Sequence, residues 1–163
     1  MLWIGRVGTP AGPRWARSFT SGAAPGPDSA LEAIDDPFAD EEGEPYARAL
    51  RLGGEPLGPV SAARVLAPVR PSKVICVGRN FRAHAAELGN EVPSEPLLFF
   101  KPPSCIVASG EPVALPRGYA RIDMESELVA VIGRKARAIA AADAWQHVAG
   151  YTLGNDISNR DLQ

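Results

Sequence analysis

The chain has 163 residues, of which 45% are hydrophobic and 22% charged, the composition of a folded globular protein. Its formal net charge of −2 argues against the basic surface that nucleic-acid-binding proteins use. The longest apolar run, near Leu128–Ile132, is far shorter than the roughly 20 residues that cross a bilayer, so no membrane span is expected.

The N-terminus begins with MLWIGRVGTPAGPRWARSFTS, which contains three arginines, and the first acid of the chain is Asp28. An acid-free start with arginines is also typical of organelle transit peptides. We favour a β-hairpin, because the turn residues GTPAGP separate two strand-like runs, LWIGRV and RWARSF. With a hairpin at this position, the compartment is expected to be cytoplasmic.

An acidic segment follows, with eight acids and no Lys or Arg between Asp28 and Glu44. Prolines before, within and after it indicate a solvated loop or a disordered stretch, and a cation-binding role is the weaker alternative. The runs ARALRLGG and ARVLAPV look strand-like. Residues 1–70 are therefore predicted to form a small β-rich N-terminal module with an acidic loop at 28–44.

From Pro71 onward the pattern predicts mostly short strands with two helices. Strands are expected at 73–78, 96–102, 123–133 and 151–158, with two more around a turn at 109–110. Helices are expected at 80–88 and 138–150. The fold class is therefore α+β, mainly β, with an antiparallel or mixed sheet.

The stretch DMESELVAVIG, residues 123–133, brings two acids against an apolar strand. Side chains alternate along a strand, so Glu125 and Glu127 share a face with Cα atoms about 6.6–6.8 Å apart. From Leu128 onward both faces are apolar, which predicts burial on both sides. Alone, this pair is more typical of a solvated strand face. Asp156 follows another predicted strand, and three carboxylates make a site for Mg²⁺, Mn²⁺ or Ca²⁺.

His84 and Glu87 lie three residues apart on the first predicted helix, so they share a face. A carboxylate beside an imidazole can orient it and raise its basicity, which would make a general base. An ordinary pair of exposed side chains on a helix is the alternative, and the spacing by itself does not decide between them.

With these residues identified, the chain resembles the fumarylacetoacetate hydrolase family, and in particular its small prokaryotic acylpyruvase and 2-hydroxyhepta-2,4-diene-1,7-dioate isomerase members. The resemblance runs from Pro71 to the last residue and depends on several motifs together. These are KVICVGRNFRAHAAELGN, PLLFFKPPS, RIDMESELVAVIGRKAR and HVAGYTLGNDISNRDLQ. The first seventy residues are similar more loosely.

The resemblance implies that residues 71–163 form the N-terminal part of a catalytic domain built as a rolled mixed β-sheet. It also implies a divalent metal, Mg²⁺ or Mn²⁺, and a role for eight residues. The metal ligands would be Glu125, Glu127 and Asp156, the residues that activate water would be His84 and Glu87, and those near substrate would be Arg160, Gln163 and Lys101.

Substrates of this family are 1,3-dicarbonyl acids, small 2-oxo acids and related enols. A divalent metal stabilises the enolate that forms, which serves C–C bond hydrolysis, decarboxylation and enol isomerisation alike. The resemblance further implies a homodimer when the domain is complete. Family members continue past Gln163, so the chain is expected to be a C-terminally truncated form. The alternative function is a catalytically inactive metal-binding remnant or an oligomerisation partner of a longer paralogue.

Overall fold

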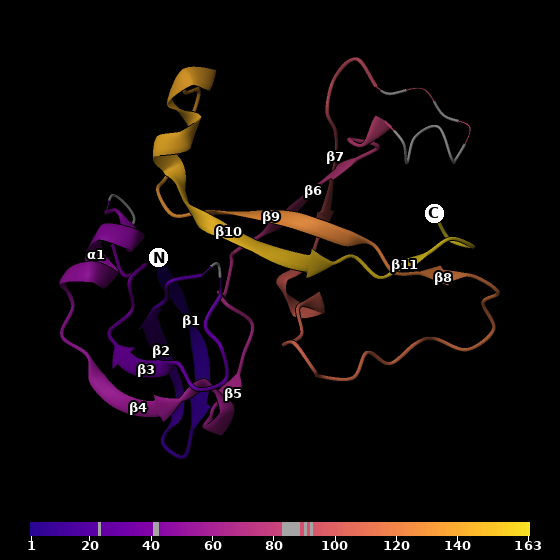
Figure 1. The fold of residues 1–163 in the computed structure, drawn as a ribbon. Helices are drawn as coiled ribbons and strands as arrows, with labels where there is room; N and C mark the ends of the chain where they lie inside the picture. The colour runs from indigo at the N-terminus through magenta and orange to yellow at the C-terminus, as the bar shows by residue number, and fades with distance from the viewer. Residues whose placement is uncertain (23, 41–42, 83–88, 90, 92) are drawn as a thin grey trace. The chain divides into compact units, whose positions relative to one another are not determined.

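A computed structural model describes residues 1–22, 24–40, 43–82, 89, 91 and 93–163 of the chain (Figure 1). These residues form two compact units. Met1–Pro68 and Ala108–Gln163 make up the first unit, and Val69–Val107 make up the second. The division differs from the sequence-based one at residue 70, which stays a prediction. Within the described residues, no helix is long and apolar enough to cross a membrane.

The N-terminal part of the first unit is a five-stranded sheet in the order β4-β3-β2-β1-β5, with every neighbouring pair antiparallel. The predicted hairpin is confirmed, with Leu2 opposite Phe19 and Thr9 opposite Gly12. Gly12 has a φ of +111°, which glycine adopts without the steric cost of a Cβ, and this permits the tight turn. The strands are β1 (Leu2–Thr9), β2 (Gly12–Phe19), β3 (Ala30–Ile34), β4 (Glu55–Pro59) and β5 (Arg64–Val65).

Both faces of this sheet carry a small apolar core, because alternate residues of each strand point to opposite sides. One core cluster contains Leu2, Ile34 and Ala49, and the other contains Val7, Ala16 and Leu31. Trp15 packs against the first cluster and also contacts Phe38, with ring centroids 5.2 Å apart.

Two expectations for this module were wrong. The acidic segment is not a loop throughout, since β3 lies inside it and buries Leu31, Ala33 and Ile34. The run ARALRLGG is not a strand but mostly the helix α1 (Pro45–Arg51). Proline fits the first position of a helix, where no N–H partner is needed, and the alanines and leucine that follow favour helix. A short 3₁₀ helix, η1 (Val60–Ala62), precedes β5.

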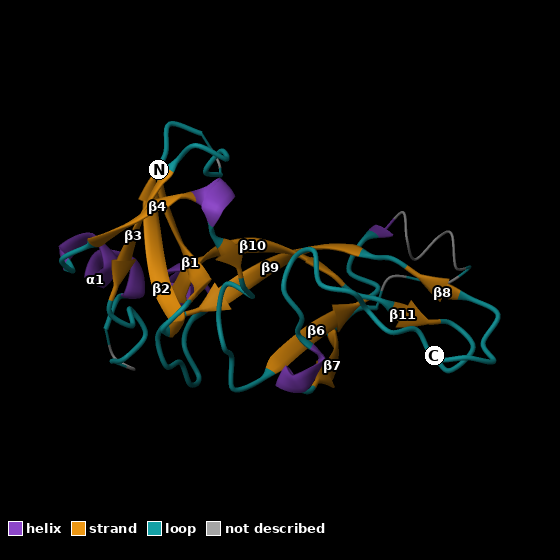
Figure 2. Ribbon diagram, turned by 90° about the horizontal axis from the view of Figure 1, so that it is seen from below, coloured by secondary structure: helices purple, strands orange, loops and turns teal. Residues whose placement is uncertain are grey.

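The C-terminal part of the first unit is a long antiparallel ribbon. Strand β9 (Ser126–Ile132) pairs with β10 (Val148–Asn155), and β8 (Ile122–Asp123) pairs with β11 (Ser158–Asn159). Both pairings belong to one register, because Ser126 lies three residues after Asp123 and Asn155 three before Ser158. In Figures 1 and 2, β8 and β11 continue the path of β9 and β10.

The ribbon corrects three further expectations. Leu128 is 67% exposed, so the predicted burial on both faces is wrong, since in the described chain β9 pairs with β10 alone. The helix expected at 138–150 is a shorter 3₁₀ helix, η3 (Ala141–His147), and Ala138 before it has a φ of +51°. The turn at 109–110 is confirmed, but its expected flanking strands are not assigned in residues 106–116.

The second unit contains the hairpin-like pair β6 (Val74–Gly78) and β7 (Leu97–Lys101), which confirms both predicted strands. They are antiparallel, and Val74 lies opposite Lys101. A short 3₁₀ helix, η2 (Pro103–Cys105), follows β7. Most of the helix expected at 80–88 lies outside the described residues. The fold class predicted from sequence, α+β and mainly β, is confirmed.

Candidate functional site: a carboxylate face on the β ribbon

The ribbon brings the three predicted metal ligands to one face. Glu127 lies opposite Gly154 in the register, and the same register places Glu125 opposite Asp156. The backbone N–H of Asp156 donates to the carbonyl oxygen of Glu125 at 2.8 Å, so the pairing continues past the end of β9. Residues that lie opposite each other across an antiparallel pair point to the same face, so the three carboxylates are neighbours.

Gly154 and Asn155 shape the backbone around these carboxylates. Gly154 presents no side chain opposite Glu127, and a Cβ built there would lie 3.0 Å from Cγ2 of Val129 and 3.9 Å from Cβ of Glu127. The Oδ1 atom of Asn155 accepts the backbone N–H of Glu125 at 3.1 Å. Asn155 therefore helps to hold Glu125 in place immediately before β9 begins.

Arg160 is the cation of this face. Its Nε donates to Oδ2 of Asp123 at 2.8 Å, its Nη2 donates to Oε1 of Glu125, and its Nη1 donates to Oε1 of Gln163. The side chains of Arg160, Asp123 and Glu125 are 12%, 25% and 20% exposed, so these ion pairs are largely shielded from solvent. The structure thus brings together three of the predicted site residues: Glu125, Arg160 and Gln163.

The Asp123 carboxylate accepts hydrogen bonds from two guanidinium groups. Arg121 donates to it from Nε and Nη2, the shorter contact being 2.8 Å, and Arg160 donates from the opposite strand. The hydrogen bonds from Arg121, and then those from Arg160, lower the pKa of Asp123 from 3.8 to about 2. The same contacts with Asp123 raise the pKa of Arg121. Asp123 is therefore an anion at neutral pH.

The backbone of Arg121 is held as well. The Oδ2 atom of Asp161 accepts the backbone N–H groups of Ala120 and Arg121, at 2.5 and 3.2 Å. The backbone N–H of Arg160 donates to the carbonyl oxygen of Arg121 at 3.0 Å. These bonds extend the ribbon beyond β8 and β11, which places Arg160 on the carboxylate face.

The donor set fits a hard divalent cation, since it consists of carboxylate oxygens on adjacent positions of one face. In the described part of the chain, however, no three His, Cys, Asp or Glu side chains converge closely enough to hold a metal ion. Glu125 is turned toward Arg160 instead. The three carboxylate residues therefore stand at positions suited to a cation site, while the Glu125 side chain itself binds the Arg160 guanidinium.

The other three predicted site residues lie in the second unit or outside the described residues. Lys101 is the last residue of β7, is half-buried, and belongs to the second unit. His84 and Glu87 lie outside the described residues. Near them in sequence, a pocket of about 250 Å³ is lined by Val77–Asn80 and Pro93–Pro96.

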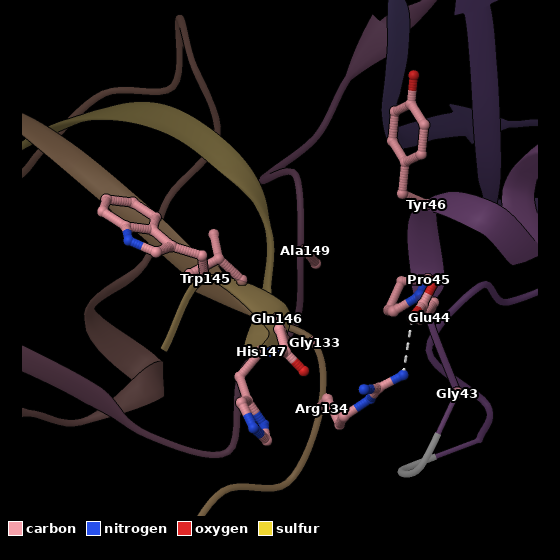
Figure 3. Close-up of a pocket in the computed structure, with 11 residues that line it drawn as sticks. Gly43, Glu44, Pro45, Tyr46, Gly133, Arg134, Trp145, Gln146, His147 and Ala149 are labelled. Carbon is pink, nitrogen blue, oxygen red and sulfur yellow. Dashed lines mark hydrogen bonds and ion pairs between the residues drawn. The ribbon is translucent and has the colours of Figure 1, made fainter. Parts of the chain in front are cut away.

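A second pocket, of about 200 Å³, lies in the first unit and contains none of the predicted site residues. Arg134 donates to Glu44 across it at 2.9 Å, as Figure 3 shows, and Trp145 and His147 also line it. Trp145 is 73% exposed. The pocket is a shallow junction between α1 and the β9–β10 end of the ribbon rather than part of the carboxylate face.

Sequence reasoning missed the roles of Asp123, Arg121 and Asn155. Strand alternation places Asp123 on the same face as Glu125, but it does not reveal which side chains contact it. The missing information was the register, which brings Arg160 between the two acids. An asparagine immediately before Asp156, and an arginine immediately before the strand, were the available signals.

Comparison with known proteins identifies the part of the chain that carries this face. A family model described as "Fumarylacetoacetate (FAA) hydrolase C-terminal" matches residues 73–163. The protein Rv2993c of Mycobacterium tuberculosis is 36% identical over 160 residues, which cover 98% of this chain and 57% of that protein. The human mitochondrial oxaloacetate tautomerase FAHD2A is 47% identical over 109 residues, covering 66% of this chain and 35% of that protein.

Solved structures agree with the sequence relatives. The 5-carboxymethyl-2-hydroxymuconate delta-isomerase of Mycobacterium smegmatis superimposes with a TM-score of 0.76 and 34% identity. The 2-hydroxyhepta-2,4-diene-1,7-dioate isomerase of Mycobacterium marinum gives 0.74 and 31%. Each match covers 100% of this chain and 57% of the other, so this chain spans less than three fifths of those relatives.

Proposed function

Because the chain belongs to the fumarylacetoacetate hydrolase family, we propose that it carries the metal-binding face of an enzyme that acts on small 2-oxo or 1,3-dicarbonyl acids. The observation that carries the proposal is the single ribbon face that presents Glu125, Glu127 and Asp156 beside the Arg160 guanidinium. An enzyme that acts on an anionic keto acid needs two elements. One is a set of oxygen ligands that hold a divalent cation, and the other is a positively charged side chain that binds the substrate carboxylate.

Isomerisation between keto and enol forms is the reaction class that we favour over C–C bond hydrolysis and decarboxylation. Three relatives are described as tautomerase or isomerase, and their substrate names denote keto or enol acids. A tautomerase needs a base and a stabilised enolate, but no attacking water. The three reactions share that enolate, so the carboxylate face itself serves any of them.

In the proposed mechanism, Glu125, Glu127 and Asp156 would hold Mg²⁺ or Mn²⁺, and the metal would supply positive charge that stabilises an enolate oxygen. Arg160 binds a carboxylate of the substrate, and Gln163, which already accepts a hydrogen bond from it, keeps the guanidinium oriented. Lys101 is proposed to bind a second anionic group of the substrate. His84, oriented by Glu87, is proposed to move the proton between carbon and solvent.

The test of this function is metal-dependent tautomerisation. The chain is incubated with the enol form of oxaloacetate and, separately, with an acylpyruvate, and the loss of enol absorbance is followed with Mg²⁺, with Mn²⁺ and with EDTA. We expect faster loss with metal than with EDTA, and none above background for Glu127→Gln. The control is Glu55→Gln, which changes an exposed carboxylate paired with Arg14 in the N-terminal sheet. Equal rates with metal and EDTA across the substrates would contradict the proposal.

Self-association is a second candidate role, and the opposite face of the ribbon favours it. Leu128 and Leu153 lie opposite each other and are 67% and 83% exposed, and Tyr151 beside them is 53% exposed. Contiguous exposed apolar side chains mark interaction surfaces. We propose that a second copy of this chain covers them in a homodimer.

Size-exclusion chromatography with light scattering tests the dimer over a range of concentrations. Leu153→Lys is expected to shift the chain toward monomer, because it places a charge in the apolar stripe. Thr152→Lys is the matched control, since residue 152 points to the other face of the same strand. A wild-type chain that is monomeric at every concentration would contradict this role.

A further inference from the structure

The Arg160 guanidinium occupies the position at which Glu125 would meet a cation. It binds Glu125 through Nη2, while a different nitrogen, Nε, binds Asp123 at 2.8 Å. The two contacts are therefore separable: one can break while the other stays. A guanidinium carries five N–H donors in a fixed plane, so Arg160 can exchange one partner without releasing the other.

The contacts of Asp123 favour a persistent hydrogen bond to the Nε atom of Arg160. Its carboxylate is fixed from its own strand by Arg121, whose two contacts involve Nε and Nη2. Its side chain is only 25% exposed, which limits screening of the ion pair by solvent and salt. Asp123 does not need to bind a metal to matter for the site.

A divalent cation and Arg160 compete for the same carboxylate. The Oε1 atom of Glu125 accepts the Arg160 hydrogen bond, and a cation held by Glu125 would bring like charge next to the guanidinium. Because both would use the same carboxylate oxygen, a change that weakens the Arg160–Glu125 contact is expected to strengthen cation binding.

From this geometry we infer that Asp123 is a positioning residue for a charge exchange. When a divalent cation binds Glu125, Arg160 leaves that carboxylate, stays attached to Asp123, and presents its freed Nη2 donors to a carboxylate of the substrate. The inference rests on the proposed function and adds an order of events, because the binding site for the substrate carboxylate becomes available only after the cation is in place.

Isothermal titration of the full chain with Mn²⁺ and with Mg²⁺ tests the competition without any need for turnover. Arg160→Gln removes the competing guanidinium and is expected to tighten cation binding about fivefold or more, a typical size for coupling between ligands. Arg64→Gln is the matched control, because it removes the same charge from an exposed guanidinium that contacts Glu111 and neither Asp123 nor Glu125. It is expected to change the affinity less than about twofold, as for a screened surface charge.

Asp123→Asn tests the positioning role through a signal that a purely structural role would not change. In a ¹⁵N-labelled chain, the Nε–H resonance of Arg160, assigned by its loss in Arg160→Gln, should persist through a Mg²⁺ titration while its Nη resonances shift. In Asp123→Asn the Nε–H resonance should lose its protection from exchange with water. Thermal melting and circular dichroism verify that each variant is folded.

The outcomes separate this inference from the proposed function. If wild type and Arg160→Gln both fail to bind Mn²⁺ or Mg²⁺, the metal site and the exchange are both wrong. If wild type binds the cation but Arg160→Gln binds no more tightly, or Arg64→Gln tightens binding equally, only the exchange is wrong. Loss of the Arg160 Nε–H signal on adding Mg²⁺ to wild type would also overturn it, because Asp123 would then not retain the guanidinium.

Discussion

The backbone N–H of Asp156 donates to the carbonyl oxygen of Glu125 at 2.8 Å, which ties two proposed metal ligands together through the main chain. Their relative position therefore depends on the strand register rather than on side-chain packing. Substitutions that preserve the hydrogen bonds between the two strands should leave the positions of Glu125 and Asp156 unchanged. Substitutions that add bulk on this face should displace the carboxylates.

Gly154→Val should crowd the face opposite Glu127. A Cβ at position 154 already lies 3.0 Å from Val129 Cγ2, and the branched side chain would extend over the space next to Glu127. We expect Mn²⁺ affinity to fall about tenfold, on the order of 1.4 kcal/mol. Titration calorimetry measures the change.

Gly150→Val is the matched control for that substitution. Gly150 lies on the same strand and face, opposite Val131, but a Cβ there meets no described atom within 4 Å. Its effect on metal affinity should be small. Equal losses from the two valines would show that glycine is needed for the strand itself and not for room beside Glu127.

Arg17 links the N-terminal sheet to α1, and Arg17→Met should destabilise this module. The nearly buried guanidinium donates to Glu32 at 2.8 Å and to the carbonyl oxygens of Ala49 and Leu52 at 2.6 and 2.7 Å. Methionine would leave these acceptors without their donor. The free energy of unfolding should fall by about 2–4 kcal/mol, measured by urea denaturation.

Arg14→Gln provides the comparison for Arg17→Met. Arg14 also pairs with a glutamate, Glu55, but at 3.3 Å and with both side chains well exposed. Exposed ion pairs of this kind contribute little, so the change should stay within about 0.5 kcal/mol. A loss as large as that of Arg17→Met would mean that charge pairing, rather than the buried carbonyl contacts, sets stability here.

Much of the architecture could be predicted from the sequence, and the failures have physical causes. Alternation and turn residues identified the β1–β2 hairpin and the strands β6, β7 and β9. Strand β3 was missed because the acids around it conceal the short apolar pattern ALEAI. Helix α1 was missed because the run ARALRLGG was expected to be a strand, although Pro45 and the residues after it favour a helix.

The candidate site could also be predicted only in part. The shared face of Glu125 and Glu127 could be predicted from strand alternation, while the role of Glu125, Glu127 and Asp156 as metal ligands stays a prediction. The Arg160–Asp123 contact could not be predicted, because it depends on which residues face each other across two strands separated by a long connection. The placement of His84 and Glu87, which lie outside the described residues, stays a prediction.

The pH dependence of stability should show a contribution from Glu111. The backbone N–H of Ala108 first, and Arg64 second, hydrogen-bond its carboxylate and lower its pKa below the ordinary 4.5. A lowered pKa means that the stabilisation is present above about pH 4.5 and is lost as pH falls through the lower value of the folded chain. Thermal melts from pH 7 down to pH 3 should show wild type losing its advantage over Glu111→Gln only below pH 4.5.

Arg64→Gln separates the two causes of the lowered Glu111 pKa. It removes the side-chain hydrogen bond from Arg64 and leaves the backbone hydrogen bond from Ala108. The Ala108 N–H still donates to Glu111 at 3.1 Å, so part of the pH-dependent stabilisation should remain in this variant. Melting temperatures for Arg64→Gln that match those of Glu111→Gln at every pH would contradict a contribution from the backbone hydrogen bond.

The register shared by the two strand pairs of the ribbon restricts insertions and deletions during evolution. One residue inserted after Met124 would rotate every preceding side chain of that strand to the other side, moving Asp123 away from Arg160 while Glu127 stayed where it is. A compensating insertion near Ile157 would have to arise on the facing strand. Point changes are therefore open to selection one at a time here, whereas changes in length survive only as matched pairs.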